Sequence, residues 1–150
     1  HIDMTTVQFC DEEMIERYAK IQYITEYINE KKEELNRHNK EIKADTSVLA
    51  NGRHMTNLGT FRAYVSAYLH NHPMIHDDMT FLVRHLQPGE HGLPLEIYVF
   101  CKDQRWPYYE AIQADIFDHI IAVVPLFDLR VFQRPSGHDM SKMVQSAKGQ

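Results

Sequence analysis

The sequence predicts an α+β fold, a ferredoxin-like α/β sandwich of order β-α-β-β-α-β with an extra helix and loop inserted after the first long helix. The clearest observation lies in residues 92–137. There a strand-like run at 95–102 leads into a helix-like run at 106–124, and a second short strand at 129–133 follows. Strand, helix and strand in close succession form half of such a sandwich.

The amino-terminal part supplies the first strand and helix of the pattern. Residues 2–9 are rich in β-branched and aromatic side chains and predict a short strand. Asp11 can cap a helix, and Glu12 and Glu13 follow it at the positive end of the helix dipole. Apolar residues at spacings of three and four then predict one helix of about 30 residues. They are Met14, Tyr18, Ile21, Tyr23, Ile24, Ile28 and Leu35.

The far side of this long helix is highly charged. We interpret it as a solvated surface. A coiled-coil arm is the alternative, weakened because the apolar stripe fades after Leu35. Residues 44–57 then read as a loop, with the turn dipeptide Asn51-Gly52. The loop leads to the inserted helix near 58–70, whose predicted buried face consists of Phe61, Tyr64, Val65, Tyr68 and Leu69.

Two further strands are predicted at 79–86 and 94–102, joined by a turn at 87–92. In the second strand, residues 95, 97, 99 and 101 alternate with residues 96, 98, 100 and 102, so each set lies on its own face of the sheet. Helices cover one face. Tyr98 and Phe100 lie on the other, so we expect a partner or a neighbouring subunit to cover that face.

The last long helix, at 106–124, completes the pattern. Pro107 suits its first turn. One side of this helix is predicted to face the core, with Tyr109, Ile112, Ile116, Phe117, Ile120 and Val124. The sequence therefore predicts three regions of the chain. Residues 1–10 are the first strand or the end of a preceding β domain, residues 11–135 form the α/β domain, and residues 136–150 form a flexible polar tail.

Composition limits the function classes. The 150 residues suit one domain. A net charge of −5 argues against nucleic acid as a partner, since that requires a basic surface. Cys10 and Cys101 make no disulfide framework and favour a reducing compartment. No apolar run reaches the ~20 residues of a membrane helix. Because His1 is not a natural start, we expect a fragment of a longer protein.

The candidate chemistry is weak. The best metal candidates are His72, His76 and Asp77, in a cluster that also holds His70 and Asp78. Imidazoles and carboxylates suit zinc, but Pro73 breaks the helical pairing of the two histidines. We therefore interpret this stretch as a solvated loop and predict no metal and no cofactor.

Two other groups of residues carry candidate chemistry. Asp115, Asp118 and His119 are interpreted as a surface pair or cap, because acid–base catalysis needs a nucleophile or cofactor nearby and the sequence offers no recognisable one. The aromatic run from Trp106 to Tyr109 lacks the interleaved basic residues of a base-stacking surface, and core packing is the preferred interpretation. No phosphate loop, G-x-S-x-G or C-x-x-C motif occurs. The sequence thus predicts that the chain is not an enzyme.

Several longer strings carry a family resemblance. They are LGTFRAY at 58–64, HPMIHDDMT at 72–80, GLPLEIYVF at 92–100, IQADIFDH at 112–119 and FDLRVFQRPSG at 127–137. With IDMTTVQF at 2–9 and the charged helix after it, the chain resembles the carboxy-terminal region of the YbdG-type branch of MscS-like mechanosensitive channels. The resemblance spans about nine-tenths of the chain.

The resemblance implies the cytoplasmic cage domain of a bacterial inner-membrane channel. Seven copies would form a hollow cage below the pore, and side portals would pass ions and small osmolytes released on hypo-osmotic shock. Transmembrane helices would precede His1, and no catalytic residue is transferred. The alternative function is a small-ligand or metal-sensing regulatory module of a membrane protein, with the histidine-rich stretch at 70–76 as its best candidate site.

Overall fold

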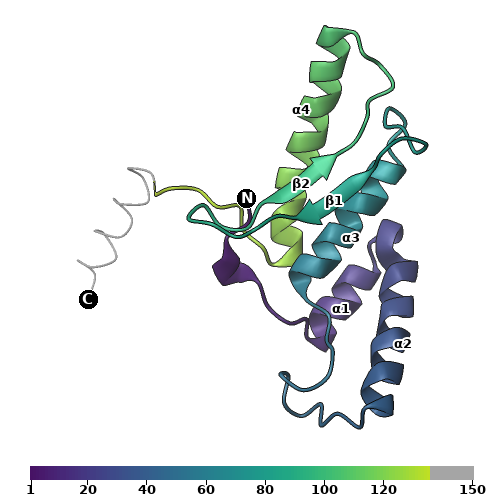
Figure 1. Ribbon diagram of the computed structural model, residues 1–150, viewed down its shortest axis with the longest axis vertical. Coiled ribbons are helices and arrows are strands. Elements are labelled where there is room, and N and C mark those ends of the chain that lie inside the picture. The colour runs from purple at the N-terminus through teal and green to yellow at the C-terminus, as the bar shows by residue number, and fades with distance from the viewer. Residues whose placement is uncertain (136–150) are drawn as a thin grey trace.

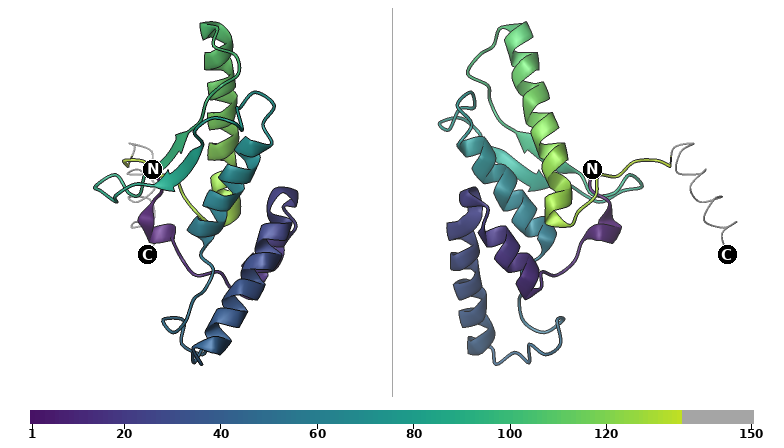
Figure 2. Two further views of the ribbon diagram at one scale, coloured as in Figure 1. Left: turned by 45° about the vertical axis from the view of Figure 1, so that its right-hand side comes forward. Right: turned by 180° about the vertical axis from the view of Figure 1, so that it is seen from behind.

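The computed structural model describes residues 1–135, and the tail predicted at 136–150 lies outside the described residues. Helices and strands are mixed, as expected for an α+β protein (Figure 1). The elements are α1 (Glu12–Ala19), α2 (Thr25–Glu41), α3 (Asn57–His70), β1 (Leu82–His85), β2 (Leu95–Tyr98) and α4 (Trp106–Val123), with short 3-10 turns at Met4–Thr6, Gln22–Ile24 and Val124–Phe127. Helices α3 and α4 lie on the same side of the strands (Figures 1 and 2).

The sheet is smaller than predicted. β1 and β2 pair antiparallel, with Leu82 opposite Tyr98 and Arg84 opposite Glu96. They form the hairpin expected between 79 and 102, and a single bridge between Ile75 and Cys101 lies beyond its open end.

The predicted strands at 2–9 and 129–133 are wrong as full strands. Only isolated bridges remain in them. Ile2 pairs antiparallel with Leu93 on one side and with Val131 on the other, and Phe9 pairs with Thr56. Two hydrogen bonds flank the second bridge, from Asp3 N to Arg130 O at 2.8 Å and from Phe132 N to His1 O at 3.0 Å. Pairing ends there because the Asp3 carboxylate accepts the Thr5 N–H at 3.0 Å and caps a 3-10 turn.

The predicted long helix is wrong as one element. It is interrupted between α1 and α2, where the Thr25 hydroxyl donates to the carbonyls of Ala19 at 2.8 Å and Ile21 at 3.1 Å. The break lets α2 fold back beside α1 (Figure 1). Buried side chains from both sides of the break, Tyr18 and Ile28, thereby reach the same core. Asp11 caps α1 as predicted, since its carboxylate accepts the Met14 N–H at 2.8 Å.

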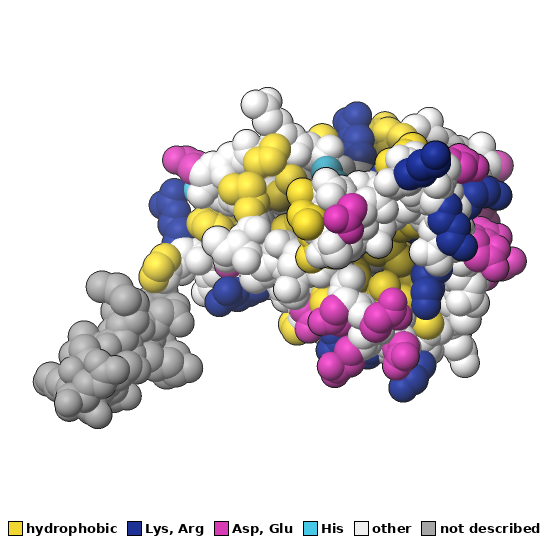
Figure 3. All heavy atoms as spheres, turned by 90° about the horizontal axis from the view of Figure 1, so that it is seen from below, with side chains coloured by type: hydrophobic (Ala, Val, Ile, Leu, Met, Phe, Trp, Pro, Cys, Tyr) yellow, Lys and Arg dark blue, Asp and Glu magenta, His cyan; other side chains and the backbone are white. Residues whose placement is uncertain are grey.

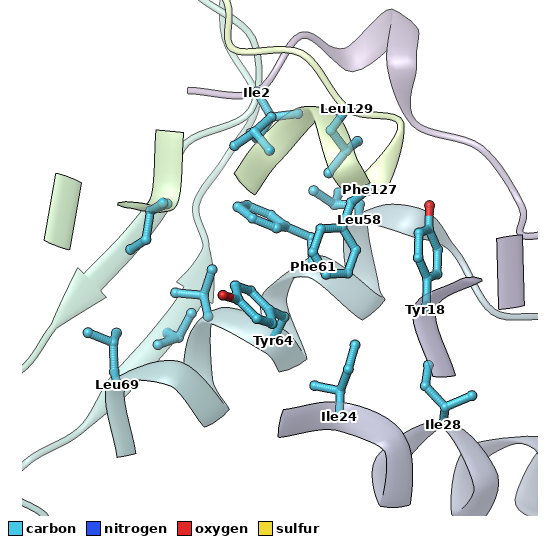
Figure 4. Close-up of a cluster of buried hydrophobic side chains, with 14 of the residues drawn as sticks. Ile2, Tyr18, Ile24, Ile28, Leu58, Phe61, Tyr64, Leu69, Phe127 and Leu129 are labelled. Atoms are coloured by element: carbon cyan, nitrogen blue, oxygen red, sulfur yellow. The ribbon is translucent and has the colours of Figure 1, made fainter. Parts of the chain in front are cut away.

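One apolar core joins these elements (Figure 4). Its centre is Phe127, which is fully buried and lies against the rings of Tyr18, Phe61 and Tyr64 at centroid distances of 5.0, 5.4 and 5.3 Å. The predicted buried face of α3 is confirmed for Phe61, Tyr64, Val65 and Leu69, whereas Tyr68 is half-buried. A side chain of this size at the centre of a core contributes several kcal/mol, roughly 3–5 when it is truncated to alanine.

Candidate functional site

The histidine-rich loop after α3 divides into separate pairs. His70 Nδ1 lies 3.4 Å from an oxygen of Asp77, and His76 Nδ1 lies 3.1 Å from an oxygen of Asp78. Asp77 and Asp78 are both exposed. Within residues 1–135, no three His, Cys, Asp or Glu side chains lie close enough together to hold a metal ion. The structure thus does not bring His72, His76 and Asp77 together.

His72 has a local structural contact instead. Its Nδ1 accepts the Met74 N–H at 3.2 Å and so stabilises the turn after α3. Its ring meets the Tyr68 ring edge to face, with 5.9 Å between centroids. Burial lowers the pKa of His72 below its ordinary value, so the neutral ring that this hydrogen bond needs is favoured near neutral pH.

His119 joins α4 to α3. Its Nε2 lies 2.7 Å from the Tyr64 hydroxyl, and its ring stacks on Tyr68 with 4.2 Å between centroids. The expected surface pairing of His119 with Asp115 is therefore replaced by contacts to α3. A half-buried histidine that is bonded and stacked in this way holds two helices together.

The two cysteines are free thiols. Burial raises the pKa of the Cys10 thiol to about 11, so it stays protonated near neutral pH. Tyr18 donates to Asp128 at 2.7 Å, and burial followed by this hydrogen bond raises the pKa of Tyr18. Arg17 pairs with the same carboxylate at 2.5 Å. Each of these groups is accounted for by packing and pairing within the domain.

Two apolar surfaces are not covered by any helix or strand within residues 1–135. One of them is the outer face of the sheet. It carries the cross-strand pair Leu82 and Tyr98, which are 40% and 49% exposed. Leu86 continues the same alternation on the first strand, and the Phe100 ring meets Tyr98 edge to face at 5.5 Å. Arg84 and Glu96 form an ion pair of 2.5 Å between these apolar groups. The predicted division of the sheet into two faces is confirmed, because Val83 is buried on the opposite face.

A second apolar surface runs along α4. The prediction that Tyr109 and Phe117 face the core is wrong, since both side chains are exposed, while Ile116, Ile120 and Val124 are buried as expected. The N-terminal turns of α4 extend past the other elements (Figures 1 and 2). Only part of the helix therefore has a neighbour against which to bury an apolar side. The periodicity of the sequence cannot distinguish these exposed residues from the buried ones, because both belong to one continuous apolar side of the helix.

Two hollows accompany these elements. An apolar groove of about 130 Å³ lies between α4 and the inner side of β2 and is lined by Ile97, Val99, Cys101, Tyr109, Ile112 and Phe117 among others. A more polar hollow of about 470 Å³ lies between α1, α2 and the loop after α2, with Lys32, Asn36, Asn39 and Arg53 in its wall. In the polar hollow, Arg53 pairs with Glu34 at 2.9 Å, so its charge is already compensated within the chain.

Charge is distributed unevenly over the surface. Lys, Arg, Asp and Glu side chains gather on the side where α2 lies, and hydrophobic side chains show in patches on other parts of the same view (Figure 3). This agrees with the interpretation of the charged side of α2 as a solvated surface. Among residues 1–135, large apolar side chains remain exposed on β1, β2 and α4.

The comparisons with known proteins give no assignment. No family model matches the chain, and no solved structure matches it. Among residues 1–135, none of the helices combines the length and the apolar character that crossing a membrane requires.

Proposed function

We propose that this chain is the cytoplasmic cage domain of a YbdG-type, MscS-like mechanosensitive channel. In this proposal it serves assembly and ion access in a homoheptamer that releases ions and osmolytes on hypo-osmotic shock. The domain lies at the cytoplasmic face of the bacterial inner membrane, attached through segments upstream of His1, and it has no catalytic role. The strings at 58–64, 92–100 and 112–119 support the family.

The order of the paired segments supports the ferredoxin-like part of the proposal. Side by side, the segments run β1, then β2 with Leu93, then Ile2, then Val131, and every pairing is antiparallel. In a β-α-β-β-α-β sandwich the first strand likewise lies between the third and the fourth, with the second at one edge. We propose that the single bridges at Ile2 and Val131 are short forms of the first and fourth strands.

The uncovered outer face of the sheet is the observation that carries the proposal of an assembly role. Leu82, Leu86 and Tyr98 are large apolar residues that remain exposed together. Apolar patches of this kind on soluble domains mark interaction sites. A wall domain that shares a ring with identical neighbours needs such a surface, whereas an enzyme needs a cluster of reactive groups.

The test uses the complete reading frame that contains this chain. We expect it to encode tracts of ~20 apolar residues upstream of His1. Expressed in bacterial cells that lack their own mechanosensitive channels, it should give a tension-activated conductance in membrane patches and raise survival after osmotic downshift. A reading frame without such tracts, or a membrane-inserted product without conductance, would contradict the proposal.

A further inference from the structure

Four exposed apolar side chains share one side of α4. They are Trp106, Tyr109, Phe117 and Ile121, with exposed fractions of 76, 40, 55 and 53%. Tyr109, Phe117 and Ile121 are spaced by multiples of four residues, so they line up along the helix, and Trp106 begins the same line at its first turn. We call this set the α4 stripe. It borders the apolar groove between α4 and β2, to which Tyr109 and Phe117 contribute.

We propose that the α4 stripe of one copy docks on the outer face of the sheet of the next copy, around Leu82, Leu86 and Tyr98. This inference rests on the proposed function, because it names the two surfaces through which neighbouring wall domains would meet. The partner is a second copy of this chain, and the contact is head to tail. Repeated from copy to copy, such a contact closes into a ring when the rotation allows it.

The charges on α4 argue against a contact of the stripe with itself. Between Trp106 and Leu129 the sequence contains no Lys or Arg, and Glu110 lies on the side of α4 that carries the stripe. Two stripes packed against each other in parallel would bring the two Glu110 carboxylates together without a basic partner, which is unfavourable. The outer face of the sheet instead presents the closed ion pair of Arg84 and Glu96, so it carries no excess of negative charge. The acidic helix thus meets less repulsion on the sheet than on another α4.

The exposed apolar area of the α4 stripe is that expected for one side of a standard protein–protein interface. Taking about 200 Å² for each large side chain, the α4 stripe exposes on the order of 450 Å² of apolar surface. A standard interface buries roughly 800 Å² per partner, a little over half of it apolar. The stripe therefore matches the apolar part of one side of such an interface.

The directions of the two surfaces also suit a head-to-tail contact. α4 lies on the inner side of the sheet, where Tyr109 and Phe117 line the groove against β2, and the outer face of the sheet is the side that the helices leave open (Figure 1). The stripe therefore belongs to the side of the sheet opposite the outer face, so one copy can offer the two surfaces to two different neighbours. A contact of one surface with its own counterpart would instead stop at a pair.

The experiment breaks each surface separately in the full 150-residue chain. The helix variant carries Phe117→Glu with Ile121→Glu, and the sheet variant carries Leu82→Glu with Tyr98→Glu. Sedimentation velocity should show concentration-dependent association of the unchanged chain and at least tenfold weaker association of each variant alone. An equal mixture of the two variants should form dimers and nothing larger, because the intact α4 of the sheet variant can dock on the intact sheet of the helix variant.

Each control adds one carboxylate outside the two surfaces, where each test variant adds two within one of them. Ala122→Glu places a carboxylate about 140° away from Phe117 around α4, and Gln87→Glu places one in the exposed turn after β1. Both should associate like the unchanged chain, and circular dichroism should show that every variant is folded. Loss of association in one variant only, or no dimer in the mixture, would overturn the inference.

The outcomes separate this inference from the proposed function. If the unchanged chain stays monomeric at millimolar concentration, the docking surfaces are wrong, while conductance of the full-length product still decides the channel function. If association behaves as expected but the full-length product shows no conductance, the function is wrong and the contact stands.

Discussion

His85 illustrates how burial of one polar side chain makes the fold sensitive to pH. It lies on β1, and its Nε2 is a buried atom without a hydrogen-bond partner in the described part of the chain. Burial, and secondarily the positive charge of Arg62, lowers the pKa of His85 below the value near 6.5 of an unfolded chain. The unfolded chain therefore binds a proton more readily than the folded one.

The sign of the effect follows from this difference in proton binding. Above about pH 6.5 His85 is neutral in both states and does not reduce the free energy of unfolding. As the pH falls towards the lower pKa of the folded state, the unfolded chain takes up the proton first, and the free energy of unfolding decreases. His85→Leu should therefore reduce the fall in melting temperature between pH 7 and pH 5, and it removes an unpaired polar atom as well. Thermal unfolding across this range checks the prediction, with His38→Leu on α2 as a control. An unchanged pH dependence in His85→Leu would contradict it.

At the scale of elements, the way in which the amino-terminal segment joins the sheet depends on one glycine. Gly92 ends the turn between β1 and β2 with a φ of +85°, a left-handed conformation that side chains disfavour. A Cβ there would meet the carbonyl oxygen of Ile2, which accepts the Leu93 N–H at 2.9 Å. The close approach that lets Ile2 bridge to Leu93 thus requires a residue without a side chain.

Gly92→Ala should destabilise the fold by about 2 kcal/mol or more, because the left-handed conformation and the close approach to Ile2 are both penalised. Gly89→Ala is the matched control in the same turn. A Cβ at Gly89 meets no atom within 4 Å, so its effect should stay within about 0.5 kcal/mol. Urea unfolding measures both, and hydrogen exchange at Ile2 and Leu93 should accelerate in Gly92→Ala alone. Equal effects of the two substitutions would refute this account.

At the scale of the whole molecule, one core predicts one unfolding transition. Buried residues of all four helices and of β1 belong to a single cluster, in which Phe127 contacts both Tyr18 of α1 and Phe61 of α3. Within residues 1–135, no separate core is available to hold the α1–α2 pair after α3 and α4 have lost their packing. Small domains of this kind unfold cooperatively.

In urea at a concentration low enough to keep the chain monomeric, far-ultraviolet circular dichroism and the near-ultraviolet tyrosine signal should therefore change together. The emission of Trp106 should shift little on unfolding, because this sole tryptophan is already 76% exposed in the folded chain. A separate early transition of helix content would show that α1 and α2 form an independent unit.

The sequence alone predicted the outer face of the sheet correctly, but it did not predict the exposed side of α4. Alternation of residues in β2 was sufficient to place Tyr98 and Phe100 on the outer face, since the side chains of a strand point alternately to opposite sides. Periodicity in α4 identified an apolar side but placed Phe117 in the core. The width of a buried stripe depends on how many neighbours the helix has, and the sequence of the helix does not contain that number.

Local patterns by themselves determined the mixed α+β composition, α3, α4, the hairpin and the Asp11 cap, because propensity, spacing and capping act within a few residues. The tertiary structure alone decided the break before Thr25, the reduction of two strands to Ile2 and Val131, and the role of Asn57. That buried amide donates to Thr6 O at 2.9 Å and accepts the Gln8 N–H at 3.0 Å. The bridges of Ile2 and the contacts of Asn57 join segments that are distant in sequence, and the break before Thr25 lets Tyr18 and Ile28 reach one core, so all three depend on how the whole chain packs.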